Sequence, residues 1–202
     1  MKRGSLLLAV VVAAIALLPL SLYARGGGHD DDATNSRAAQ APAADNEVQF
    51  DLVPASAAIA NCFPNAAAKV KVLLTADEIG TDTFILSAKG LRPDTTFAVF
   101  LTESPVSPVG SVQYIADLHT NANGKGSVSV NAIIQEAFSS QVINGQNNHK
   151  NLKHVVFWFA DPADADGCFA PANAPTTVFD GDGVAGPAAM SSKNALPGAP
   201  LP

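Results

Sequence analysis

Hydrophobic and polar residues alternate along most of the central part of the chain, which is the pattern of half-buried β-strands. In residues 68–75, for example, Val70 and Val72 alternate with Lys69 and Lys71. Similar alternation recurs in residues 47–53, 83–90, 95–102, 111–120 and 127–132. The pattern predicts antiparallel strands, each with one face on a core and the other in solvent.

Two of these segments carry more specific expectations. In residues 111–120, the alternation places Val112, Tyr114, Ala116 and Leu118 on the inner face, opposite Gln113, Asp117 and His119. The next two alternating runs are separated by Asn123-Gly124, a strong signal for a β-hairpin that pairs the two strands. Residues 133–141 favour one or two helical turns, residues 144–151 a polar loop, and residues 176–180 a last strand.

Residues 152–161 differ because both faces of the expected strand are apolar. Val156 and Trp158 fall on one face, and Val155, Phe157 and Phe159 on the other. A strand that is buried on both faces belongs inside a sheet and not at its edge.

Together these segments predict an all-β domain over residues 47–183. The number and spacing of strands, about seven to eight, are typical of an antiparallel two-sheet β-sandwich that is immunoglobulin-like in architecture only. A small β-barrel is the alternative.

The segments outside this domain predict export. Residues 1–24 have a basic start, an apolar run and small residues at the end, as in a secretory signal peptide. If this segment were not cleaved, it would anchor the protein to a membrane. Residues 25–46 are expected to be a disordered linker, and residues 184–202 a flexible tail. The predicted location is therefore secreted, or periplasmic within the cell envelope.

The two cysteines of the chain are Cys62 and Cys168. In an exported protein, an isolated pair of cysteines favours a disulfide over a metal site. The net charge of −6, without any cluster of Lys or Arg, argues against a nucleic-acid partner.

Acidic residues concentrate in two short segments, DPADADG (161–167) and DGDG (180–183). Asp and Gly are common in turns, so these segments are interpreted as turns. The alternative is a calcium site formed by Asp164, Asp166, Asp180 and Asp182, although the spacing does not match an EF-hand. Apart from this calcium hypothesis, no cofactor is expected.

Sequence motifs for nucleophilic catalysis are not found in the chain. Asp117 and His119 form the best acid–base pair, and His119 could meet His154 from another strand. The sequence therefore predicts an exported, non-catalytic module that acts in binding, adhesion or envelope assembly, with a protein or glycan ligand. The alternative is a small secreted metal-assisted hydrolase that uses Asp and His at strand ends.

Overall fold

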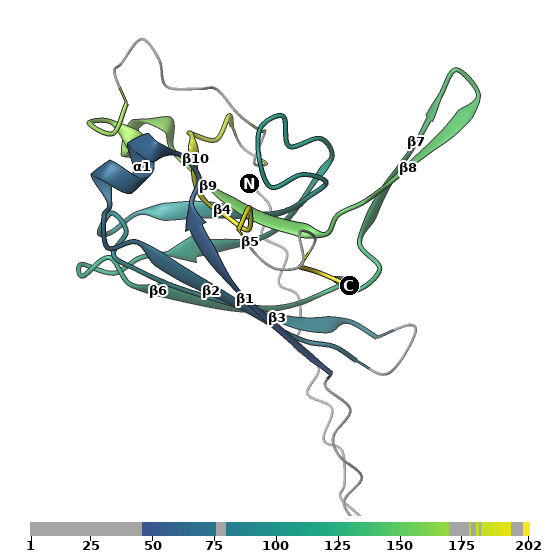
Figure 1. Cartoon of the computed structure of the whole chain (residues 1–202), viewed down its shortest axis with the longest axis horizontal. Coiled ribbons are helices and arrows are strands. Elements are labelled where there is room, and N and C mark those ends of the chain that lie inside the picture. Colours follow the sequence, from purple (N-terminus) through teal and green to yellow (C-terminus); the bar gives the residue numbers. More distant parts are fainter. Residues whose placement is uncertain (1–45, 76–79, 170–177, 179–180, 182, 195–199) are drawn as a thin grey trace, which may run out of the picture. The chain divides into compact units, whose positions relative to one another are not determined.

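The computed structural model describes residues 46–75, 80–169, 178, 181, 183–194 and 200–202. These residues form ten β-strands, a short α-helix and a turn of 3-10 helix (Figure 1). The strands are β1 (Glu47–Pro54), β2 (Ala67–Leu73), β3 (Asp82–Lys89), β4 (Thr96–Thr102), β5 (Val112–His119), β6 (Gly126–Ala132), β7 (Phe138–Ile143), β8 (Gln146–Asn151), β9 (His154–Phe159) and β10 (Ala188–Ser191). The helices are α1 (Ala57–Cys62) and η1 (Pro162–Ala165).

Several predictions concern residues that the structure does not describe. The predicted signal peptide and all but the last residue of the predicted linker lie outside the described residues. The same holds for the strand expected at residues 176–180, apart from Val178. Among the described residues, no helix is long and apolar enough to cross a membrane.

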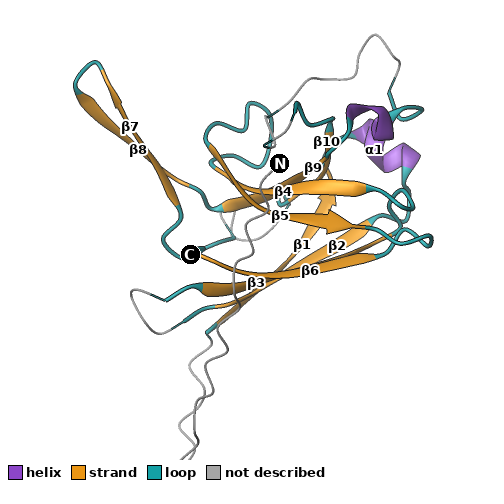
Figure 2. Ribbon diagram, turned by 180° about the vertical axis from the view of Figure 1, so that it is seen from behind, coloured by secondary structure: helices purple, strands orange, loops and turns teal. Residues whose placement is uncertain are grey.

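Eight strands form one antiparallel sheet in the order β5-β4-β9-β10-β1-β2-β3-β6. Its two halves join where Val53 and Pro54 of β1 pair with Ser191 and Met190 of β10. The two edge strands of this order, β5 and β6, lie against each other. The sheet therefore curls around a common core and is nearly closed (Figure 2). The predicted all-β fold class is confirmed, in a form between a sandwich and a barrel.

The core lies between the two halves of the sheet and follows the alternation seen in the sequence. On β2, Val70 and Val72 are fully buried, while Lys69 and Lys71 form ion pairs with the acidic residues of β1 outside. Half of the buried core residues are large apolar side chains from β1, β2, β3, β4 and β9: Phe50, Leu52, Val70, Val72, Phe84, Leu86, Phe97, Val99, Leu101, Val155, Phe157 and Phe159.

Strand β9 is buried on both faces, as its sequence predicts. All six of its residues are buried, and the strand lies between β4 and β10 inside the sheet. On its outer face, Val156 and Trp158 pack in a second cluster with Ala98, Phe100 and Ala185. The rings of Trp158 and Phe100 meet edge to face, with their centroids 5.3 Å apart.

Strand β10 corrects the prediction of a flexible tail over residues 184–202. In the part of this segment that the structure describes, β10 pairs with both β9 and β1 and completes the sheet. Ala189 and Met190 are fully buried. The segment contains small side chains and no clear alternation, so backbone pairing positions it and the hydrophobic pattern does not reveal it.

The Asn123-Gly124 step forms a turn, but the paired hairpin predicted around it is wrong. Among the strands that the structure describes, β5 pairs only with β4, and β6 pairs only with β3, at the two edges of the sheet. At this turn the chain passes from one half of the sheet to the other. A Cβ atom at Gly126 would lie 2.3 Å from the carbonyl oxygen of His119, so the close approach of β5 and β6 requires glycine here.

A paired hairpin forms at the next Asn-Gly step of the chain. Within the described ranges, β7 and β8 pair only with each other and form a separate two-stranded sheet. Asn144 and Gly145 connect them with φ angles of 52° and 77°, as a type I′ turn requires. The helical turns expected at residues 133–141 and the polar loop expected at 144–151 are therefore wrong, since both segments contribute to strands. The side chains of β8 are polar throughout, so the hydrophobic pattern does not indicate a strand there.

Candidate functional site

A groove of about 1080 Å³ lies on the outer face of the β4–β5 pair, beside η1. Its floor comes from β4 and β5, and its wall comes from the chain between β9 and β10. The described residues that line it are Thr96, Phe100, Val112, Tyr114, Asp117, Ala160, Asp161, Pro162, Asp164, Gly181, Gly183 and Val184.

A β-bulge brings Tyr114 to this groove, although the alternation predicts an inward side chain. The β4–β5 register shifts between Val99 and Phe100, so that one extra residue of β5, Ile115, is accommodated. As a result, Ile115 packs on the core, and Tyr114 faces outward with 45% of its surface exposed. The Tyr114 ring meets Phe100 edge to face, at a centroid distance of 5.6 Å.

The segment DPADADG forms the wall of the groove, and its first aspartate caps a helix. The Asp161 carboxylate accepts a hydrogen bond of 2.8 Å from the backbone N–H of Ala163, directly before η1. Pro162 follows at the start of η1, where its missing N–H has no cost. This is the turn chemistry that the sequence predicts for the segment, and it leaves Asp164 beside the groove.

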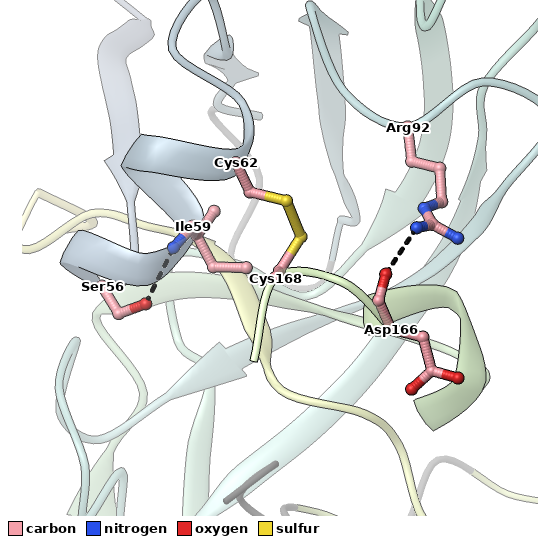
Figure 3. The surroundings of a disulfide bond; sticks show 6 residues. All are labelled: Ser56, Ile59, Cys62, Arg92, Asp166 and Cys168. Carbon is pink, nitrogen blue, oxygen red and sulfur yellow. Dashed lines mark hydrogen bonds between the residues drawn. A yellow bond between two sulfur atoms is a disulfide. The ribbon is translucent and has the colours of Figure 1, made fainter. Parts of the chain in front are cut away.

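Two interactions fix this wall to the rest of the domain (Figure 3). The disulfide predicted from the sequence is confirmed: Cys62 at the end of α1 is bonded to Cys168, with their Cα atoms 5.4 Å apart. In addition, the Arg92 guanidinium donates a hydrogen bond of 2.7 Å to the backbone carbonyl of Asp166. These two interactions hold the C-terminal end of the 162–168 segment.

The four aspartates of the calcium hypothesis have different surroundings. Asp164 lines the groove, whereas Asp166 contributes its backbone carbonyl to Arg92 and is not part of the lining. Asp180 and Asp182 lie outside the described residues. Within the described part of the chain, no three His, Cys, Asp or Glu side chains are grouped closely enough to hold a metal ion. Calcium binding by the complete set stays a prediction.

The candidate acid–base residues are divided between the two ends of β4. Asp117 lines the groove, and the Nδ1 atom of His119 lies 2.8 Å from the Thr96 hydroxyl. His119 pairs in register with Thr96, whereas His154 pairs with Thr102. Six residues of extended strand separate these positions, or roughly 20 Å. His119 and His154, which the sequence left as a possible pair, therefore do not meet.

His154 has a structural environment instead. Its side chain is buried at the start of β9, where the Nδ1 atom lies 3.3 Å from the Ser192 hydroxyl. Burial lowers the pKa of this imidazole, because the charged form loses its hydration. The neutral ring is thus the form that the folded protein favours.

The sequence matches no protein-family model and no curated protein. The groove is therefore interpreted from its own residues. Sequence reasoning identified Asp117 and Asp164 as candidates but missed Tyr114, because alternation alone does not reveal a bulge. It also gave no sign that the acidic segment would lie beside β5.

Proposed function

We propose that the protein is an exported, non-catalytic binding module that takes up a basic, extended segment of a partner protein in this groove. The disulfide supports the first part of the proposal, because disulfides persist mainly in extracytoplasmic compartments. The charge and shape of the groove support the second part.

The observation that carries the proposal is the distribution of charge around the groove. Three carboxylates, those of Asp117, Asp161 and Asp164, border it, and its described lining contains no Lys, Arg or His. The net charge of the whole chain is also negative, at −6. Such a surface attracts cationic ligands and repels anionic ones, and it raises the rate at which cationic partners associate.

The aromatic side chain at the floor adds a second kind of contact. A Lys or Arg side chain that enters the groove can lie over the exposed ring of Tyr114, in a cation–π interaction. Phe100 contacts this ring edge to face and thereby restricts its orientation. The carboxylates beside the ring attract the charge of a basic side chain, an attraction that a neutral sugar lacks.

The spacing of the carboxylates favours an extended ligand. They are not grouped as the ligands of one metal ion would be, so each carboxylate provides a separate position for a positive charge along the groove. A peptide with several basic side chains matches this arrangement better than a single small cation does.

Fluorescence anisotropy with a labelled peptide of alternating Arg and Gly tests the proposal, with a Glu–Gly peptide of equal length as the comparison. The Arg–Gly peptide should bind, and its affinity should fall steeply as the salt concentration rises, because exposed charges are screened. Asp117→Asn and Asp164→Asn should each weaken binding by up to about fivefold, as expected for one exposed ion pair. Asp161 is left unchanged because it caps η1.

Asp51→Asn is the matched control. Asp51 lies on β1 in the other half of the sheet, where it pairs with Lys69 at 2.7 Å, and its substitution changes the net charge equally. The control should bind like the wild type. Equal binding by all three variants, binding that does not respond to salt, or selective binding of a neutral oligosaccharide would each reject the proposal.

A further inference from the structure

The β7–β8 hairpin is a second candidate interaction element, on a different part of the molecule from the groove. It projects from the eight-stranded sheet as a separate arm (Figures 1 and 2). Two of its large apolar side chains are strongly exposed, with 76% of Val142 and 57% of Phe138 in contact with solvent. An isolated two-stranded hairpin is only marginally stable in water, so such an arm gains stability when a further strand pairs with it.

The arm has a defined base. The Lys150 ammonium lies 3.1 Å from the Glu103 carboxylate, and this contact lowers the pKa of Glu103. Just before β7, the backbone N–H groups of Ile134 and Gln135 donate hydrogen bonds of 3.0 and 2.8 Å to the buried carboxylate of Asp82. The outer edge of β7 is therefore presented on a supported hairpin.

The ladder between the two strands determines which backbone groups face outward. Bonded and non-bonded pairs alternate along an antiparallel ladder, starting with the bonded pair Ile143–Gln146 that flanks the two-residue turn. The N–H and C=O groups of Phe138, Ser140 and Val142 consequently point away from β8. Within the described part of the chain, these groups have no hydrogen-bond partner.

The two edges of the arm differ in charge. β7 reads FSSQVI and contains no charged side chain, whereas β8 reads QNNHKN and contains Lys150. A lysine on an edge strand discourages pairing with another strand. β7 is thus the edge of the arm that can pair without placing like charges side by side.

We propose that β7 pairs with β7 of a second copy of this chain, in antiparallel orientation around a two-fold axis at Ser140. In this register, Ser140 lies opposite the partner's Ser140, and Phe138 lies opposite the partner's Val142. All three outward-facing residues then exchange backbone hydrogen bonds, about six in total. Each apolar side chain also meets an apolar side chain on the same face, which stabilises cross-strand pairs.

The other symmetric arrangements are less favourable. A shift of the β7 register by two residues leaves one outward-facing residue without its pair. Self-pairing of β8 brings its cationic Lys150 close to its own copy. Self-complementarity of one patch is what a two-fold interface requires, and β7 meets this condition.

This inference is independent of the proposed function, because the arm and the groove share no lining residues. It has a consequence for binding, however. A dimer carries two grooves, so a partner with several basic segments would bind with higher avidity than the monomer allows.

Disulfide trapping with Ser140→Cys tests the contact directly. Both native cysteines are already bonded to each other, so the new thiol is the only free one. Bonded antiparallel pairs have Cα atoms about 5.5 Å apart, a distance that a disulfide can span. Mild oxidation should convert most of this variant to a covalent dimer. Asn148→Cys, at a position on β8 that is also exposed, should remain mainly monomeric.

Sedimentation equilibrium of the full mature chain tests the same contact without a cross-link. The wild type should show a concentration-dependent dimer, since one short edge makes a small interface. Val142→Lys should shift the protein to the monomer, and Asn148→Lys should not. Equal trapping at positions 140 and 148, or no dimer by either method, would overturn the inference. Retained binding of the Arg–Gly peptide by Val142→Lys would show that the groove acts separately.

Discussion

Removal of the disulfide should destabilise the domain strongly, and the structure indicates by how much. Cys62 and Cys168 are separated by 106 residues. For a closed loop of this length, the chain-entropy model gives about 5 kcal/mol, because the cross-link restricts the unfolded chain. The double variant Cys62→Ala/Cys168→Ala should therefore lose about 4–5 kcal/mol of unfolding free energy.

The local structure adds a second consequence. α1 has only six residues, too few to be stable alone, and its side-chain anchor in the core is Ile59. Without the bridge, α1 keeps the core contact of Ile59, and the wall that bears Asp164 keeps the buried Ala165 and the hydrogen bond from Arg92 to Asp166. Affinity for the Arg–Gly peptide should fall together with stability.

Urea unfolding monitored by Trp158 fluorescence measures the effect. With a slope of about 2 kcal/mol per molar urea, the midpoint should fall by about 2 M. Reduced wild-type protein is the control and should unfold like the double variant. A loss below about 1 kcal/mol would show that the bridge closes a loop that is already ordered in the unfolded chain, and would refute the entropic reasoning.

Two further predictions concern single buried side chains. Trp158→Ala should cost about 3–5 kcal/mol of unfolding free energy, and Trp158→Phe clearly less, in urea unfolding. Equal costs for the two variants would mean that the indole is not packed against its cluster. Burial lowers the pKa of His154 below its ordinary value of 6.5. As the pH falls, the unfolded chain therefore takes up a proton at this side chain before the folded protein does. Stability should therefore fall as the pH drops below 6.5. His154→Gln should show a weaker dependence, and an identical dependence would contradict the argument.

The parts of the fold that could be predicted are those in which one face of a strand is buried. In β2 and β3, burial of alternate side chains is the main stabilising term, and the same alternation appears in the sequence. The apolar character of both faces of β9 likewise placed it inside the sheet. Hydrophobic pattern predicts structure where hydrophobic burial determines it.

Elsewhere, backbone hydrogen bonds or local geometry determine the structure, and the pattern does not reveal them. β10 is positioned by pairing on both sides, and β8 by a type I′ turn, although its side chains are polar. Asn-Gly occurs twice in the chain. It connects unpaired strands at Asn123 and paired strands at Asn144, so the dipeptide specifies a turn without specifying the pairing of its flanks.

The aspartates of DPADADG show why the site was harder to predict than the fold. Asp161 caps η1 through its carboxylate, Asp164 borders the groove, and Asp166 binds Arg92 through its backbone carbonyl. An Asn substitution should therefore weaken ligand binding at position 164 and leave the hydrogen bond to Arg92 intact at position 166. At position 161 it should keep the helix cap, because Asn caps helices about as well as Asp, and remove one charge from the groove. One residue type serves three purposes within six positions, because the turn of η1, the disulfide and Arg92 give each aspartate different surroundings. The chemistry of the segment thus depends on contacts with α1 and with the loop before β4, which are distant in the sequence.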